Sequence, residues 1–361
     1  MKYMTRRHIT TQGLCTFFAA TAFCLTSATA ADLPVVPTLP TPAKPDGKEA
    51  DMSKPVQVYI LLGQSNMVGM GEVGGDETGS LKDIIKTKNK FNYLLDEAGN
   101  WSARKDVRNV RVMLGRKGVM KVFKNDWLSI GGKFGPEFGI GPYLGEAVEA
   151  PVMLLKSCIG NRSLGYDLLP PGTEPYEFQG QVIPGYRGTA ANPKGNGPKP
   201  EGWYPGKQYD DDIEYAKDVL SKLGEYYPGA TKYEVAGFFF WQGEKDCYSD
   251  ENASRYEKNL VNFIKALRKE FNAPNAKFVL ATLGEATRGC GGNGEKVLEA
   301  QLAVDGATGK YPEFKGHVAT VYAHPFSMGG TGAGHYDGNP ETYMNVGEAM
   351  GKAMVGLLKS K

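Results

Sequence analysis

Residues 56–67 read VQVYILLGQSNM, and this stretch decides the fold. Its first seven residues are apolar or β-branched apart from Gln57, and the run stops at Gly63. An apolar run of this length predicts a strand buried on both faces, as in a parallel sheet. Ser65 follows the strand directly, at the end where open α/β sheets bind their ligands.

Similar apolar runs recur along the chain, and helical patterns separate them. The runs lie at 152–155, 235–241, 278–283 and 318–322, and the helical patterns at about 137–149, 209–226, 252–271, 294–304 and 341–358. This alternation predicts an α/β fold, a doubly wound and mostly parallel five-stranded sheet with helices on both faces.

The two ends of the chain do not share this pattern. Residues 1–30 have a basic start, an apolar run too short to span a bilayer and a final Ala28-Thr29-Ala30, which is typical of a secretory signal peptide. We therefore expect a secreted protein, in the periplasm or outside the cell, with no membrane segment after cleavage. Residues 31–54 are rich in proline and predict a flexible linker.

Residues 55–361 predict one domain with long insertions at about 72–135 and 165–207. The first insertion has short β-like patterns at 107–114 and 119–123. The second is rich in Gly, Pro and Tyr, and a loop of that length is usually functional or disordered. Its aromatic residues favour either a wall on which sugar rings stack or an ordered surface flap.

Charge and cysteine content exclude several classes of function. Removal of residues 1–30 lowers the net charge from +2 to −1, so no basic surface is expected for nucleic acid or an anionic membrane. Three cysteines remain, so at most one disulfide forms, and we choose Cys247–Cys290. No Cys or His spacing predicts a zinc site, and nothing indicates another metal or an organic cofactor.

Three motifs follow the predicted strands: GQSNM at 63–67, KSCIGNRSL at 156–164 and WQGEKD at 241–246. Gly63 allows a sharp turn that exposes the Ser65 hydroxyl, although an isolated serine there is more often a helix N-cap. Gly160 lets the backbone approach a reacting carbonyl and offer its N–H to a developing oxyanion, although a plain turn is an equal reading.

A serine nucleophile needs a base, and histidine suits that task near neutral pH. His317 opens a buried strand pattern and is expected to be structural, while His324 follows the fifth strand and is a reserve candidate. His335 lies in GHYDGN at 334–339, just before the last helix, and is our choice.

Together these motifs resemble the SGNH hydrolases, in the variant of sialate O-acetylesterase-like proteins and the acetylxylan esterases of carbohydrate esterase family 6. Segments 133–139, 299–301 and 333–351 add to the resemblance, which covers nearly all of 55–358. It implies a flavodoxin-like sheet order, Ser65 as nucleophile and His335 as base. It also implies Gln242 as a side-chain donor to the oxyanion, beside the N–H groups of Ser65 and Gly160.

The chain departs from this family pattern in two places. Asn161 stands where the family usually has a second glycine, and Asn tolerates a left-handed backbone better than most residues. Gly332 stands where many members carry the acid of the triad, three residues before the histidine. The acid is then Glu244, which we favour, Asp246 or Asp337, or a backbone carbonyl holds a serine–histidine dyad.

The resemblance implies a secreted serine esterase that hydrolyses O-acetyl esters of an oligo- or polysaccharide through an acetyl-enzyme on Ser65. One alternative is a non-catalytic carbohydrate-binding protein on the same fold, which Gly332 favours. Another is an esterase or lipase that acts on other esters, but a lipase would show an apolar lid and 165–207 is not apolar. No phosphate-binding glycine motif follows a strand.

Overall fold

The computed structural model describes residues 33–115, 118–189 and 197–360. The signal peptide predicted for residues 1–30 lies outside the described residues. The five predicted strands form one parallel set in the order β4-β1-β7-β8-β9, which confirms the flavodoxin-like arrangement. Their bounds are β1 Val56–Gly63, β4 Val152–Ser157, β7 Tyr233–Trp241, β8 Lys277–Ala281 and β9 Val318–Val321.

The sheet has seven strands, so the prediction of five was too small. β2 (Arg104–Leu114) pairs parallel with β4, and β3 (Met120–Leu128) pairs antiparallel with β2 at the edge. Both come from the segment at 72–135 that was predicted to be an insertion. Leu128 is the one buried residue of β3. An edge strand buries little surface, so the sequence of β3 includes charged residues and lacks a continuous apolar run.

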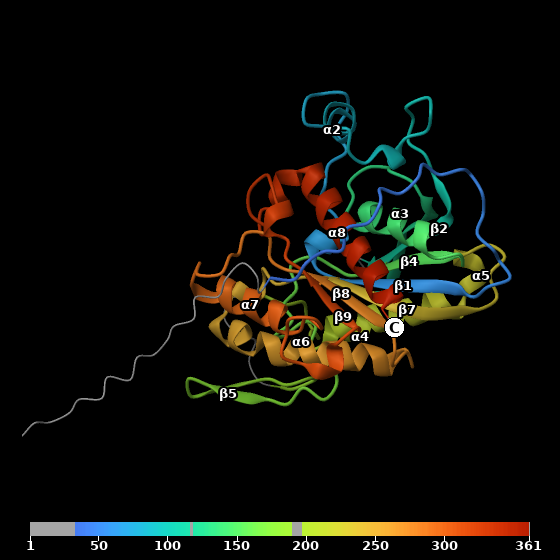
Figure 1. Cartoon of the computed structure of the whole chain (residues 1–361). Coiled ribbons are helices and arrows are strands. Elements are labelled where there is room, and N and C mark those ends of the chain that lie inside the picture. The colour runs from blue at the N-terminus through green and yellow to red at the C-terminus, as the bar shows by residue number, and fades with distance from the viewer. Residues whose placement is uncertain (1–32, 116–117, 190–196, 361) are drawn as a thin grey trace, which may run out of the picture. The chain divides into compact units, whose positions relative to one another are not determined.

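Helices cover both faces of the sheet (Figure 1). Alternate residues of β1 point to opposite faces. Ile60 belongs to the core that includes residues of α4, α6 and α7, and Leu61 to the core that includes residues of α2, α3 and α8. The bounds are α2 Leu81–Lys88, α3 Glu137–Ala147, α4 Lys207–Ser221, α6 Asp250–Glu270, α7 Gly292–Ala303 and α8 Pro340–Lys359. Two four-residue helices, α1 (Ser65–Val68) and α5 (Leu223–Tyr226), complete the set of α-helices in the described residues.

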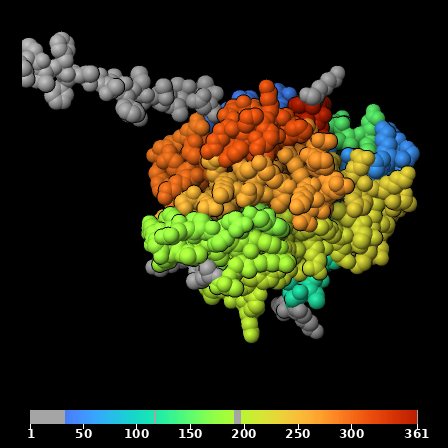
Figure 2. Space-filling model, turned by 90° about the horizontal axis from the view of Figure 1, so that it is seen from below, coloured from blue at the N-terminus to red at the C-terminus, as the bar shows by residue number. Residues whose placement is uncertain are grey.

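The second insertion packs on the domain. It contains a small hairpin of β5 (Tyr176–Phe178) and β6 (Gln181–Ile183), which lies against α6 (Figure 2). The Tyr176 hydroxyl donates to the carbonyl of Glu251 at 2.5 Å, and the Arg255 guanidinium lies 4.3 Å from the Tyr176 ring. Two of the contacts that hold this hairpin therefore come from the start of one helix.

Residues 33–54, predicted to be a flexible linker, form no helix or strand but pack on the same domain. Leu33 contacts the core on one face of the sheet, and Val36 and Leu39 contact the core on the other. No helix of the described residues has the length and apolar character needed to cross a bilayer.

Candidate active site

Ser65 stands at the first residue of α1, immediately beyond β1. Gly63 has φ +142°, and a Cβ there would overlap the carbonyl oxygen of Trp241 on the neighbouring strand. Glycine is therefore required at the end of β1, where the chain turns away from the sheet close to the backbone of β7. The turn leaves Ser65 at the carboxyl end of the sheet with a partly exposed side chain.

His335 reaches Ser65 from the other end of the chain. Its Nε2 lies 2.9 Å from Ser65 Oγ, which is hydrogen-bonding distance. His335, Tyr336 and Asp337 all have left-handed backbones, with φ of 58°, 51° and 51°. Such strain is rare for residues with a side chain and tends to occur at functional sites.

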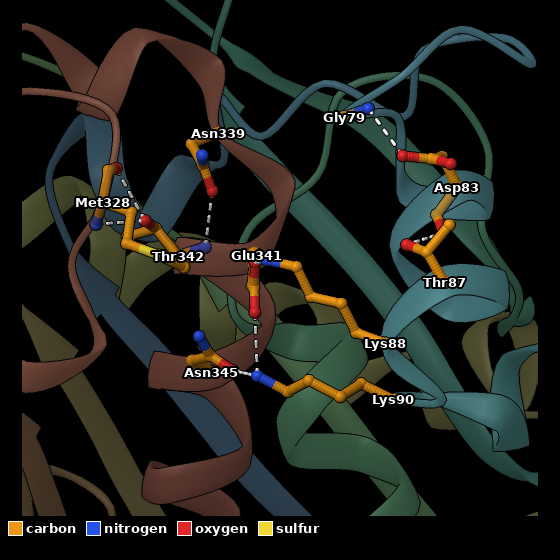
Figure 3. Close-up of polar contacts among 10 residues, drawn as sticks. All are labelled: Gly79, Asp83, Thr87, Lys88, Lys90, Met328, Asn339, Glu341, Thr342 and Asn345. Carbon is orange, nitrogen blue, oxygen red and sulfur yellow. Dashed lines mark hydrogen bonds and ion pairs between the residues drawn. The ribbon is translucent and has the colours of Figure 1, made fainter.

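Contacts on both sides of His335 hold its loop in place (Figure 3). Asn339 caps α8 by accepting the N–H of Thr342 at 3.0 Å, and the Thr342 hydroxyl exchanges two hydrogen bonds of 2.8 Å with the backbone of Met328. Next to Thr342, Glu341 forms ion pairs with Lys88, the last residue of α2, and with Lys90 just beyond it. The first insertion is thereby attached to the helix that carries the histidine loop.

The second motif lies directly beside Ser65. A Cβ on Gly160 would be 3.3 Å from the Cβ of Ser65, so the backbone of Gly160 borders the nucleophile. Asn161 has φ +59°, a left-handed conformation that asparagine accepts at lower cost than most residues. The structure thus brings the second motif next to Ser65, as the sequence predicts.

The side-chain N–H groups of Gln242, predicted to donate to an oxyanion, have other partners. Its side chain is fully buried, and Nε2 already donates to the Arg162 carbonyl at 2.9 Å and to Asp246 Oδ2 at 2.6 Å. Both amide hydrogens are therefore used, and Oε1 accepts from the Tyr256 hydroxyl. Gln242 therefore links the end of β7 to the second motif through its hydrogen bond to the Arg162 carbonyl.

Glu244 contacts the two residues that flank Ser65 and forms no hydrogen bond with the His335 ring. Its carboxylate is buried and accepts from the side-chain amide of Gln64 and from Asn66 Nδ2, the latter at 2.7 Å. Across the described residues, no carboxylate forms a hydrogen bond with the His335 ring. Glu244 is instead connected to His335 through Asn66, which also donates to the Gly332 carbonyl at 3.0 Å.

The other candidates have separate places. Asp246 is buried and accepts the N–H groups of Leu164 and Gly165 at 2.9 and 2.8 Å, so it braces the second motif. The Asp337 carboxylate points towards Gly330, where a Cβ would be 3.0 Å from its Oδ2. His324 contacts the Gly284 carbonyl through Nδ1 at 2.8 Å. Its ring has this separate backbone partner, while His335 contacts Ser65.

A buried ion pair supports α1, and sequence reasoning missed it. Lys156 Nζ lies 2.5 Å from Glu137 Oε2, and the two side chains are 1% and 7% exposed. The same ammonium group donates to the carbonyl of Val68, the last residue of α1, at 3.1 Å. The pair therefore holds the short helix that begins with Ser65 against α3 and β4.

Cys158, Cys247 and Cys290, the cysteines of the described residues, are free thiols, which corrects the predicted disulfide. Cys247 Sγ donates to the Gly243 carbonyl and Cys290 Sγ to the Gly291 carbonyl, so each contacts its own loop. Within the described ranges, no group of three or more His, Cys, Asp or Glu side chains is arranged to hold a metal ion.

Glu244 gives the stability of the protein a defined pH dependence. Burial, and then repulsion from Glu285, raise the pKa of Glu244 from 4.5 to about 7. The folded state therefore binds this proton more tightly than the unfolded chain, so Glu244 lowers stability as pH rises from 4.5 to 7, by about 3 kcal/mol. Urea unfolding should show a flatter decline across that range in Glu244→Gln.

The same substitution at exposed Glu97, whose carboxylate pairs with Lys44 at the surface, is the control. We expect Glu97→Gln to keep the wild-type slope. Equal slopes in wild type and Glu244→Gln would show that Glu244 takes up no extra proton on folding.

Comparisons with known proteins give one family and several distant structures. Residues 195–355 match the family described as carbohydrate esterase, sialic acid-specific acetylesterase, and no curated protein matches the chain. The matched residues include Gln242, Glu244 and His335, whereas Ser65 and Gly160 lie outside them.

Among solved structures, a protein of Arabidopsis thaliana has a TM-score of 0.47 at 16% identity, over 83% of this chain and 98% of its own. A carbohydrate acetylesterase from Xanthomonas citri has a TM-score of 0.47 at 13% identity, over 82% of this chain and 55% of its own. NanS has a TM-score of 0.36 at 12% identity, over 64% and 69%.

Proposed function

Because this chain is similar to the sialic acid-specific carbohydrate esterases over residues 195–355, we propose that it is a serine esterase that removes acetyl groups from carbohydrate. The observation that carries the proposal is the 2.9 Å contact between Ser65 Oγ and His335 Nε2 at the carboxyl end of the sheet. A serine and a histidine held at this distance form a nucleophile and its base. The proposed location, outside the cytoplasm, rests on the signal-like sequence of residues 1–30.

Catalysis would proceed in two acyl transfers. His335 takes the proton of Ser65 as Oγ attacks the acetyl carbonyl, and the resulting oxyanion is held by the N–H groups of Ser65 and Gly160. His335 then gives the proton to the departing sugar hydroxyl. A water molecule, deprotonated by His335, finally hydrolyses the acetyl-enzyme and releases acetate.

Glu244 is the acid in this scheme, acting through the groups around it. Its carboxylate fixes the amides of Gln64 and Asn66, which flank Ser65 in the sequence. Asn66 in turn holds Gly332, whose carbonyl accepts the N–H of His335 at 3.0 Å. The negative charge of Glu244 also favours the protonated form of His335 that appears during attack.

A covalent probe of the nucleophile tests the proposal. Diethyl p-nitrophenyl phosphate should inactivate the enzyme, with one phosphoryl adduct found on Ser65 by peptide mass spectrometry. Acetate release should then be measured from O-acetylated sialic acid and from acetylated xylan, which identifies the glycan. Absence of both the adduct and acetate release, together with measurable binding of either glycan, would favour the carbohydrate-binding alternative.

A further inference from the structure

Two carboxylates meet at Gly332, the position where the related esterases often carry their triad acid. A Cβ on Gly332 would lie 2.6 Å from Glu244 Oε1 and 2.7 Å from Glu285 Oε2. The Gly332 N–H donates to Glu285 Oε2 at 3.1 Å. A side chain at position 332 has no room while both glutamates stay in place. The carboxylates near His335 therefore come from Glu244 and Glu285 and not from residue 332.

The two glutamates come from neighbouring strands. Glu244 lies three residues beyond β7 and Glu285 four residues beyond β8, and these strands pair in parallel register. Both carboxylates therefore arrive at the carboxyl end of the sheet, where Asn66 donates both to Glu244 and to the Gly332 carbonyl. The N–H and the C=O of Gly332, three residues before His335, are thus both hydrogen-bonded to side chains.

No fixed positive charge neutralises this pair. Neither glutamate forms an ion pair with a Lys, Arg or His in the parts of the chain that the structure describes. The groups that face Glu244 are the amides of Gln64 and Asn66, the carboxylate of Glu285, the hydroxyls of Tyr256, Tyr336 and Tyr343, and the thiol of Cys247. The cation that develops nearby is the imidazolium of His335.

We propose that Glu285 is a positioning residue of the active site, which acts with Glu244 to fix the His335 loop and to stabilise the charge that His335 gains. The inference rests on the proposed esterase function. Glu285 fixes the loop through its hydrogen bond to the Gly332 N–H, and the His335 N–H bonds the carbonyl of the same residue. Glu285 is exposed, so solvent weakens the attraction between its carboxylate and the imidazolium, and the buried carboxylate of Glu244 supplies the larger part of this charge effect.

Two variants separate the charge of Glu285 from its hydrogen bond. Glu285→Gln keeps an acceptor for the Gly332 N–H but removes the charge, and Glu285→Ala removes both. Because repulsion from Glu285 contributes to the raised pKa of Glu244, loss of the charge should move the acid limb of the kcat/KM profile for p-nitrophenyl acetate to lower pH, by up to about one unit. We expect Glu285→Ala to lower kcat by about 10- to 100-fold, as misplacement of a catalytic group does, and Glu285→Gln to lose less.

Glu313→Gln is the matched control. Glu313 is exposed, pairs with Lys265 and precedes β9, whereas Glu244 and Glu285 follow the ends of their strands. It should keep the wild-type profile. The inference is overturned if Glu285→Ala keeps wild-type kcat, or if both Glu285 variants lose activity equally at every pH in step with a loss of stability. The proposed esterase function would survive either result, since it is decided by wild-type turnover and by the adduct on Ser65.

Discussion

Ser65→Ala is expected to reduce kcat/KM for a small acetyl ester by about 10⁴- to 10⁶-fold. Ser65 Oγ is the atom that would form the bond to the acetyl carbon, and it is the group within 2.9 Å of His335 Nε2. Without it, His335 can still activate water, and the Gly160 N–H can still bind the oxyanion, so a small residual rate should persist. Initial rates of p-nitrophenyl acetate hydrolysis measure the effect.

His335→Ala should cause a loss of similar size, and the double variant should be little worse than either single one. Residues that act as one unit show this non-additivity, because removing either already disables the attack. Ser254→Ala, which alters an exposed serine on α6, is the control and should retain full activity. Hydrolysis by Ser65→Ala at more than a few per cent of the wild-type rate, under single-turnover conditions that exclude contaminating esterase, would refute the mechanism.

Lys156→Ala is expected to destabilise the fold by about 3–5 kcal/mol. The substitution leaves the Glu137 carboxylate buried without its partner and leaves the carbonyl of Val68 without a donor. The cost of an unpaired buried charge exceeds that of the lost contact itself. Urea unfolding monitored by tryptophan fluorescence measures it, and activity should fall as well, because α1 carries Ser65.

Lys54→Ala is the matched control for this prediction. Lys54 also pairs with a glutamate, Glu149, at 2.7 Å, but the two side chains are 41% and 88% exposed. An exposed pair contributes about 0–1 kcal/mol. Lys156→Met combined with Glu137→Leu should recover most of the stability, because both buried charges disappear together. A loss below about 1 kcal/mol in Lys156→Ala would mean that Glu137 reaches solvent or another cation.

The sequence was enough to predict the five central strands and most helices, because these elements are buried on both faces or amphipathic. Strand β3 was missed as part of the sheet for the opposite reason, since its residues contact solvent and charged side chains interrupt the pattern. The packing of residues 33–54 was also missed. Their few apolar side chains, Leu33, Val36 and Leu39, are spaced too widely to form a periodic signal.

For the site, the motif order and strand ends predicted that Ser65, Gly160 and His335 would lie together, and the structure brings them together. Sequence reasoning failed where the role of a side chain depends on its partners. Gln242 has the right residue type and position for an oxyanion donor, but Asp246 and the Arg162 carbonyl take both amide hydrogens. The sequence signal for Glu285 is only its place just beyond a strand, which Glu244 shares.

The nucleophile and the base are separated by 270 residues of chain, and α8, which follows His335, packs against α3. Contacts between residues this distant in sequence form late in folding. The chain loses conformational entropy when the loop closes, before the contact contributes any stabilising free energy. Recovery of activity during refolding should therefore follow the slowest kinetic phase. Hydrolysis of an acetyl ester then reports when Ser65 and His335 come together. We expect it to recover after the spectroscopic signals of secondary structure have returned.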